Sequence, residues 1–227
     1  MKLIIYFTLL FILPGFTFSQ TDTKFWFAIP EVTEQHADKP VKLHLSSFGN
    51  ATKVTVSVPA NSNISSLVFN LEANETRSID LIEEFAALQL LENINPNIVE
   101  NKGLLIESND LITAYYEVLG TGIYGVVNTD IFTLKGSNAL GKEFYTPFQT
   151  VFDNYSYGTA PDAWSSIDFV ATEDNTTINI TPTTETYNTP LNNPANTVIT
   201  INLNKGQTYS CLLYTSDAAD AEESVDL

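Results

Sequence analysis

Apolar and polar residues alternate one by one along much of this chain, which is the pattern of a β-strand with one buried face. Residues 41–46 and 54–58 both alternate valine or leucine with polar side chains. Gly49 and Asn50 lie between the two segments, and Pro59 ends the second. This arrangement predicts a β-hairpin that turns at Gly49-Asn50.

Further short segments of the same kind are separated by Asn, Gly, Pro and Asp, the residues that favour turns. They predict strands at 25–29, 67–71, 103–106, 111–118, 131–134, 143–146, 166–172, 177–181 and 198–203. Asp174-Asn175 predicts a second hairpin, between the strands that contain Phe169 and Ile178. The chain is therefore predicted to be all-β, with one or two antiparallel β-sandwich-like domains, a possible division near 120–140, and a truncated C-terminal end.

Two segments depart from the strand pattern. Residues 81–92 have apolar positions at helical intervals after Ser78 and Asp80, two suitable N-cap residues, and predict one short helix. A strand that continues through residues 79–82 is the alternative. Residues 187–196 contain two prolines and several asparagines, so they predict a long exposed loop.

The N-terminus predicts export. Lys2 is followed by an apolar run that ends at Pro14 and Gly15, with small residues before Gln20. This is the pattern of a secretory signal peptide over residues 1–19. A membrane anchor is the competing interpretation, but it needs about 20 apolar residues, and no second apolar stretch of that length follows. We expect a secreted or cell-surface protein without membrane insertion of the mature chain.

Charge and cysteine content narrow the function further. With 10 basic and 27 acidic residues the formal net charge is -17, which argues against nucleic acid and anionic lipid as partners. Cys211 is the single cysteine, so no intrachain disulfide can form.

Residues 211–227 differ from the rest of the chain. Their first ten residues resemble the translation of a transposon-end adapter that is used to prepare sequencing libraries. The segment is rich in Asp and Glu and shows no strand alternation. We interpret it as a non-native tail, with an ordinary acidic tail as the alternative.

No recognised catalytic motif is present: there is no nucleophile elbow, phosphate-binding glycine loop, helical zinc motif or EF-hand. His44 lies on the polar face of its strand, where we expect it to face solvent. A metal site that combines both histidines, His36 and His44, with Glu34 and Asp38 is the alternative to this solvent-facing role. Carboxylates that could act as acid and base are present, but no spacing favours a pair. They are Glu107, Asp110, Glu117, Asp130, Asp162, Asp168, Glu173 and Asp174.

Aromatic residues are the better candidates for ligand binding. Tyr155, Tyr157 and Trp164 lie in or beside an Asn- and Gly-rich stretch at 153–162 and could contact a sugar ring or a peptide. Cross-strand packing is the simpler explanation for Tyr115, Tyr116 and Tyr145. Core packing is also preferred for Trp26, whose neighbours are apolar.

Several segments together resemble a known family. They are FWFAIPEV at 25–32, NKGLLIESND at 101–110, ITAYYEV at 112–118, DIFTLKGSNALGKEFYTPFQ at 130–149, IDFVATEDNTTINITPT at 167–183 and LNKGQTY at 203–209. The chain resembles the IgGFc-binding protein N-terminal domain family in its bacterial, Bacteroidetes-type secreted form, over most of residues 25–210. The part from Leu134 to Pro147 and the segment 171–182 are its most specific features.

The resemblance implies an all-β extracellular module of a larger surface or secreted protein that takes part in adhesion and binding. It implies no catalytic residues and no cofactor, and Fc binding is not carried over to this chain. The predicted partner is an extracellular protein or glycan. The alternatives are a carbohydrate-binding accessory module, a secreted glycan-active enzyme, and a structural spacer without a ligand.

Overall fold

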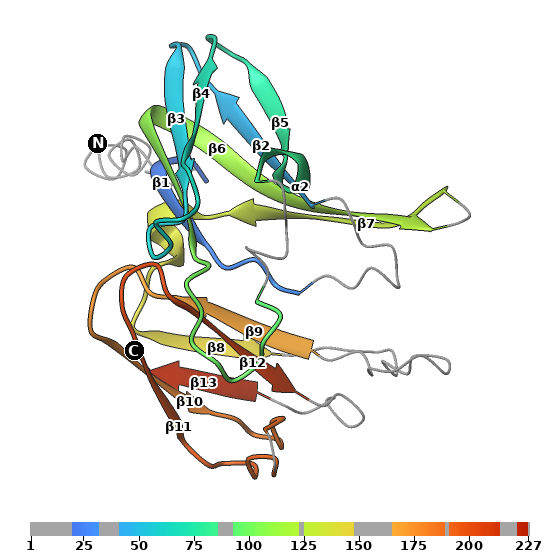
Figure 1. Cartoon of the computed structure of the whole chain (residues 1–227), viewed down its shortest axis with the longest axis vertical. Helices are drawn as coiled ribbons and strands as arrows, with labels where there is room; N and C mark the ends of the chain where they lie inside the picture. Colours follow the sequence, from blue (N-terminus) through green and yellow to red (C-terminus); the bar gives the residue numbers. More distant parts are fainter. Residues whose placement is uncertain are drawn as a thin grey trace, which may run out of the picture.

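The computed structural model describes residues 20–31, 41–85, 93–122, 125–147, 165–188, 191–213 and 222–226. Two β units lie one above the other (Figure 1). The strands of the N-terminal unit are β1 (Asp22–Phe27), β2 (Val41–Ser47), β3 (Thr52–Ser57), β4 (Leu67–Leu71), β5 (Thr76–Asp80), β6 (Leu104–Gly122) and β7 (Gly125–Leu134). Those of the C-terminal unit are β8 (Glu143–Pro147), β9 (Ser165–Val170), β10 (Thr176–Thr181), β11 (Ile199–Leu203), β12 (Thr208–Leu213) and β13 (Glu222–Asp226). The signal peptide predicted at 1–19 lies outside the described residues.

The predicted fold class is confirmed, because the chain is mostly β and its sheets are antiparallel. The only helical elements in the described residues are the short helix α2 (Leu81–Glu84) and the 3-10 turn η3 (Gly136–Ala139). The amide of Glu83 donates to Asp80 Oδ1 at 3.3 Å, so Asp80 caps α2 as its position predicts. The remainder of the predicted helix, 86–92, lies outside the described residues.

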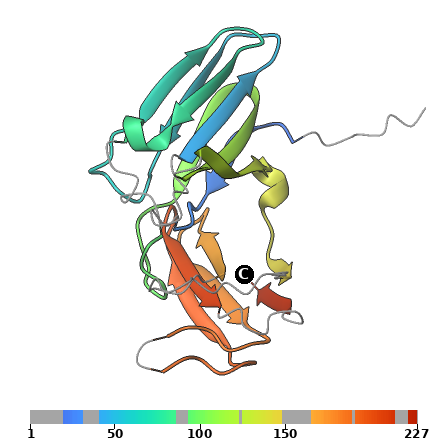
Figure 2. The same cartoon turned by 90° about the vertical axis from the view of Figure 1, so that its right-hand side faces the viewer.

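The N-terminal unit is a seven-stranded sheet organised around the long strand β6. The first part of β6 pairs with β1 and β3, through residues such as Ile106 opposite Phe25 and Val56. The second part pairs with β2 and β7, for example through Ala114 opposite Leu45 and Leu134. The sheet therefore has two halves that share one strand, and it curls over its own core (Figure 2).

The hairpin predicted at Gly49-Asn50 is wrong. Both β2 and β3 run antiparallel to β6, β2 along residues 112–118 and β3 along residues 105–108. The chain thus keeps its direction through residues 48–51 and turns a corner from one half of the sheet to the other. Strands β4 and β5 repeat the arrangement, because β4 pairs with β3 and β5 pairs with β2.

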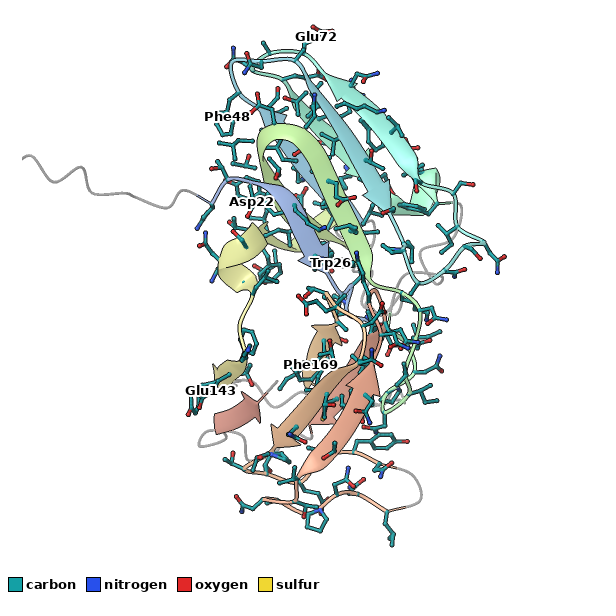
Figure 3. All side chains as sticks on the ribbon, turned by 90° about the vertical axis from the view of Figure 1, so that its left-hand side faces the viewer. Asp22, Trp26, Phe48, Glu72, Glu143 and Phe169 are labelled. Atoms are coloured by element: carbon teal, nitrogen blue, oxygen red, sulfur yellow. The ribbon has the colours of Figure 1, made fainter. Side chains whose placement is uncertain are left out.

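Polar groups hold this corner together, near Phe48 and Glu72 in Figure 3. Asn50 Nδ2 donates to Asp110 Oδ2 at 2.7 Å, and the amide of Lys53 donates to Asn109 Oδ1 at 2.7 Å. These bonds explain why β6 continues through 107–110, where the polar sequence predicts a strand end. The polar side chains of this stretch form hydrogen bonds with groups at the bend, so the strand does not end there.

The core of the N-terminal unit lies between the two halves of the sheet. Phe25, Val54 and Ile106 come from one half, and Leu43 and Leu45 from the other, all fully buried. Each is an apolar member of an alternating strand, so the period-two pattern correctly identifies the core face. Burial of side chains of this size stabilises the fold by about 1.5–3 kcal/mol each.

The C-terminal unit also contains a corner at which consecutive strands continue from one strand pair to the next. Strand β9 pairs with β12 and β10 pairs with β11, in registers that continue across residues 171–175 and 204–207. The hairpin predicted at Asp174-Asn175 is therefore also wrong, because that turn carries the chain around a corner. Backbone bonds continue through the corner: the amide of Ala171 donates to Gln207 O at 3.0 Å, and that of Gly206 donates to Ala171 O at 2.8 Å.

The non-native origin of residues 211–227 stays a prediction. The structure places Cys211 in β12, where it is fully buried opposite Ile167, although the lack of alternation predicts no strand there. Strand β13 pairs with β8 and β10. The proposed division of the chain near 120–140 is not decided either, but the chain passes from one sheet to the other between Leu134 and Glu143.

A segment of the N-terminal unit, residues 93–103, descends beside β12 before β6 begins (Figures 1 and 2). Glu100 and Thr208 exchange backbone hydrogen bonds at 2.9 and 2.8 Å. The side chain of Asn93, only 3% exposed, donates to Ile29 O at 2.9 Å and accepts from Thr208 Oγ1 at 2.5 Å. We call this junction, formed by 93–103 with residues 204–210, the joint.

Glycines allow the two units to approach closely at the joint. The amide of Gly103 donates to Gly206 O at 3.0 Å. A Cβ at Gly103 would lie 2.6 Å from Val170 Cγ2 and 2.7 Å from Gly206 O. Gly206 has a φ of +79°, in the left-handed region that favours glycine. The glycine of the LNKGQTY segment, Gly206, thus permits the contact between the units.

Candidate binding surface

The outer side of one half of the N-terminal sheet carries a continuous polar surface. Because Val41, Leu43 and Leu45 point into the core, the residues between them point outward from β2. The registers place outward residues of β5 and β6 beside them. We call this surface the His44 face: Lys42, His44, Ser46, Thr76, Ser78, Asp80, Tyr115 and Glu117.

His44 is fixed on both sides of its ring. Its Nδ1 lies 2.8 Å from Ser78 Oγ, and its Nε2 lies 2.5 Å from Glu117 Oε2. The side chains of His44 and Glu117 are 20% and 18% exposed, so the pair is largely covered. The prediction that His44 lies on the polar face is correct, but its ring is held between two partners and is only partly exposed.

Ser78, His44 and Glu117 are the residue types of a hydrolytic triad, and their order of contact is that of nucleophile, base and orienting carboxylate. Catalysis also requires N–H donors aimed at the developing oxyanion. Ser78 lies within a strand, where the backbone N–H groups lie in the plane of the sheet and the side chain stands perpendicular to it. The contacts of His44 with Ser78 and Glu117 hold these three side chains in place on the polar surface.

The structure gives no support to a metal site at His44. Among the described residues no group of three or more His, Cys, Asp or Glu could hold a metal ion. Both ring nitrogens of His44 already have partners. The other predicted ligands, His36, Glu34 and Asp38, lie outside the described residues.

The predicted acid and base candidates have separate structural roles. Glu107 forms an ion pair with Lys24 at 3.1 Å, and Asp110 belongs to the corner of the N-terminal unit. Asp174 Oδ1 accepts from the amide of Lys205 at 3.0 Å in the other corner, in a turn as predicted. Asp162 lies outside the described residues.

Asp168 is the exception among these carboxylates. Ser166 Oγ donates to its Oδ2 at 2.7 Å, while its Oδ1 is buried without a hydrogen-bond partner in the described structure. Burial raises the pKa of Asp168 above 3.8, and the charge of Glu31 raises it further, against hydrogen bonds from Ser166 and Ser210. This side chain favours its protonated form more than an exposed aspartate does.

The three residues predicted to bind a ligand, Tyr155, Tyr157 and Trp164, all lie outside the described residues. Among the described residues, the other tyrosine candidates, Tyr115, Tyr116 and Tyr145, do not form one platform. Neighbours Tyr115 and Tyr116 point to opposite sides of β6, and Tyr116 is a core residue at 2% exposure. Tyr145 is 67% exposed on β8.

Core packing is the wrong prediction for Trp26. Phe25 and Phe27 face the core of the N-terminal unit, so alternation sends Trp26 to the opposite side of β1. There it is half-buried and pairs with Leu105. Figure 3 places it at the end of the N-terminal unit that faces the C-terminal unit.

Sequence patterns missed strand β5 as a separate element. Residues 76–80 read Thr-Arg-Ser-Ile-Asp, with Ile79 as the one buried apolar side chain. One apolar residue in five gives too weak an alternation to predict a strand. Pairing with β2 defines it instead, and β5 forms one end of the strand order in this sheet.

Comparison with family models gives one match. Residues 130–222 match the family model described as IgGFc binding protein. The resemblance found in the sequence is thereby confirmed for this segment, which begins in β7 and covers almost all of the C-terminal unit. The matched segment includes the corner at 204–207 but not the His44 face.

No curated protein matches the chain. Among solved structures, a crystal structure of Thermotoga maritima 1070 matches 51% of this chain and 97% of its own, at 16% identity and a TM-score of 0.27.

Proposed function

We propose that this chain is a non-catalytic binding or adhesion module of a larger secreted or cell-surface protein. The observation that carries the proposal is the match of residues 130–222 to the IgGFc-binding family, which suggests an extracellular binding module. The signal-peptide pattern at the N-terminus supports export. No described helix has the length and apolar character to cross a membrane.

The construction of the molecule suits a binding role. Two small cores would give weak independent units, but the joint connects them through backbone and side-chain hydrogen bonds. A pre-organised surface loses little conformational entropy when a ligand binds. The net charge of -17 favours ligands that are neutral or basic over nucleic acid.

A carbohydrate ligand is the second candidate, and the outer face of β10 and β11 favours it. Thr177 Oγ1 donates to Asn202 Oδ1, and Thr200 Oγ1 donates to Asn179 Oδ1, both at 2.8 Å. These pairs form a regular row of hydroxyl and amide groups, which can bind sugar hydroxyls through their remaining donors and acceptors. Stacking on sugar rings is the role that the sequence predicts for Tyr155, Tyr157 and Trp164.

The two candidates can be separated with a panel of purified secreted glycoproteins, each tested before and after enzymatic removal of its glycans. The chain is immobilised and binding is measured by surface plasmon resonance, while mass spectrometry records any change in the analyte. A protein-binding module retains the intact and the deglycosylated analyte. A carbohydrate-binding module loses its signal on deglycosylation and on Tyr155→Ala, Tyr157→Ala or Trp164→Ala.

Turnover is the result that would contradict a non-catalytic role. Analyte fragments that appear with the unmodified chain and disappear with Ser78→Ala would establish the Ser78, His44 and Glu117 arrangement as an active site. Saturable binding without fragments supports the proposal. Complete absence of binding across the panel would favour a structural spacer.

A further inference from the structure

The outer face of β10 and β11 is a polar surface without charge, because neither strand contains a charged residue. Isoleucine side chains of both strands pack into the core of the C-terminal unit: Ile178, Ile180, Ile199 and Ile201. The residues that alternate with them point outward and are two threonines and two asparagines: Thr177, Asn179, Thr200 and Asn202. The outer side of the N-terminal sheet differs, because it carries charged residues such as Lys42 and Lys53.

Each outward threonine holds the asparagine on the opposite strand. The register places Thr177 opposite Asn202 and Thr200 opposite Asn179, and both threonine hydroxyls donate to the amide oxygen at 2.8 Å. A threonine hydroxyl that donates keeps its lone pairs as acceptors, and an asparagine that accepts through its oxygen keeps two N–H donors on its nitrogen. Both pairs therefore present oriented donors and acceptors side by side, and little conformational entropy is lost when a ligand uses them.

An exposed tyrosine lies on the same face of this sheet, whose strand order is β11, β10, β13 and β8. Phe144 of β8 packs against the core of the C-terminal unit, so its neighbours Glu143 and Tyr145 point to the outer side. Tyr145 is 67% exposed, and its hydroxyl donates to Glu143 Oε1 at 2.8 Å, which orients the ring. In Figure 3, Glu143 lies at the margin of this unit and Phe169 lies within it.

The register brings Tyr145 into line with the outward residues of β10. One residue of β13, Ser224, is opposite both Thr181 of β10 and Tyr145 of β8. Neighbouring strands lie about 4.8 Å apart, so Tyr145 is two strand spacings, about 10 Å, from Thr181. Phe144 packs against the same core as β10, so the position of β8 does not rest on β13 alone. One sugar ring is too small to reach both Tyr145 and the Thr-Asn pairs, whereas a chain of several sugar units can reach both.

The chemistry of this face suits a carbohydrate better than a protein. Sugar hydroxyls both donate and accept, as the Thr-Asn pairs do, and the apolar side of a sugar ring can pack on an aromatic ring such as that of Tyr145. Protein interfaces are usually anchored at their centre by Trp, Tyr or Arg, and none of these stands among the four paired residues. The net charge of -17 and the exposed Glu143 disfavour acidic sugars.

We propose that the outer face of the sheet formed by β11, β10, β13 and β8 binds an extended stretch of a neutral polysaccharide. The pairs Thr177-Asn202 and Thr200-Asn179 form hydrogen bonds with the sugar hydroxyls, and Tyr145 stacks on a further sugar unit. The inference rests on the proposed binding function and names its ligand class. It places the ligand inside the segment that matches the IgGFc-binding family, on residues other than the three aromatic ones predicted from the sequence.

The first test asks which sugars bind the complete chain. Fluorescein-labelled hexasaccharides of glucose, galactose, mannose and N-acetylglucosamine are the neutral probes, a hexasaccharide of galacturonic acid is the acidic control, and fluorescence anisotropy reports binding. We expect at least one neutral hexasaccharide to bind, the matching disaccharide to bind at least about tenfold more weakly, and the acidic control not to bind. Binding of no neutral probe, equal binding of the hexasaccharide and the disaccharide, or preference for the acidic control would overturn the inference.

The second test assigns the bound sugar to this face. Tyr145→Ala should weaken binding of the hexasaccharide at least about fivefold, whereas Tyr145→Phe keeps the ring and should weaken it less than about twofold. Thr177→Val combined with Thr200→Val keeps the side-chain shapes, removes both hydroxyls and should weaken binding about tenfold. The matched control is Thr55→Val, at an outward position of β3 in the N-terminal sheet. Circular dichroism checks that every variant folds.

The outcomes separate this inference from the proposed function. Unchanged binding by Tyr145→Ala or by the double valine variant, or equal weakening by Thr55→Val, would place the sugar elsewhere and overturn the inference. If no hexasaccharide binds but deglycosylated glycoproteins are still retained by the chain, the inference fails and the proposed binding function stands. Absence of both kinds of binding would contradict the two together.

Discussion

Gly103→Ala tests whether the joint connects the two units as tightly as its distances indicate. The added methyl group would lie 2.6 Å from Val170 Cγ2 and 2.7 Å from Gly206 O, whereas non-bonded carbon atoms prefer about 3.5–4.0 Å. The valine can rotate, but the backbone carbonyl of Gly206 cannot move without opening the joint. Overpacking of this kind costs about 1–3 kcal/mol, and weakening the 3.0 Å bond between Gly103 N and Gly206 O adds about 1 kcal/mol.

The natural control is Gly49→Ala, because a Cβ at Gly49 meets nothing within 4 Å. Any Gly→Ala substitution lowers the conformational entropy of the unfolded chain, which stabilises the folded protein by about 0.4–1 kcal/mol. Gly49→Ala measures this effect alone. Relative to this control, Gly103→Ala should lower the free energy of unfolding by about 2–4 kcal/mol and the Tm by about 4–16 °C. Urea titration and calorimetry measure both values. If the two variants melt within about a degree of each other, the close approach at the joint is not as described.

Three further predictions concern buried or linked polar groups. Asp168→Asn should stabilise the protein at pH 7 but not below about pH 4. A buried carboxyl with a raised pKa destabilises the folded protein once the pH exceeds the pKa of that carboxyl in the unfolded chain, and asparagine removes this effect. Urea titration at several pH values measures the difference in free energy of unfolding. Asn93→Ala should cost about 1–3 kcal/mol in the same assay, since Thr208 loses its buried acceptor, and a value near zero would contradict the assigned bonds. For Asp22, burial alone would raise the pKa, but hydrogen bonds from Ser137 lower it. Asp22→Asn should therefore destabilise the protein at pH 7, with the difference from the unmodified chain vanishing as pH falls below about 3.

Alternation in the sequence identified strands and their buried faces but not their neighbours. The face of β2 that carries Leu43 and Leu45 is buried as predicted, because side-chain direction is a local property. Pairing is not local: the turn residues at Gly49-Asn50 and Asp174-Asn175 suit a corner as well as a hairpin. Both predicted hairpins are wrong because the partner strand, β6 or β12, lies elsewhere in the chain.

The candidate surface was harder to predict than the core. His44 was placed correctly on a polar face, but its two partners belong to strands 34 and 73 residues away. The residues chosen for binding, Tyr155, Tyr157 and Trp164, remain a prediction.

The descent of residues 93–103 into the other unit also affects how the chain acquires its structure. Asn93 and Thr208 are 115 positions apart, so their contact forms only after the chain is available as far as residue 208. Contacts between such distant residues slow folding. Until β12 arrives, Ile98 and Val99 belong to a segment with unpaired backbone, which is a site for incorrect association. A chaperone that shields this stretch before β12 pairs should therefore raise the yield of native protein more than one that binds β2 or β3.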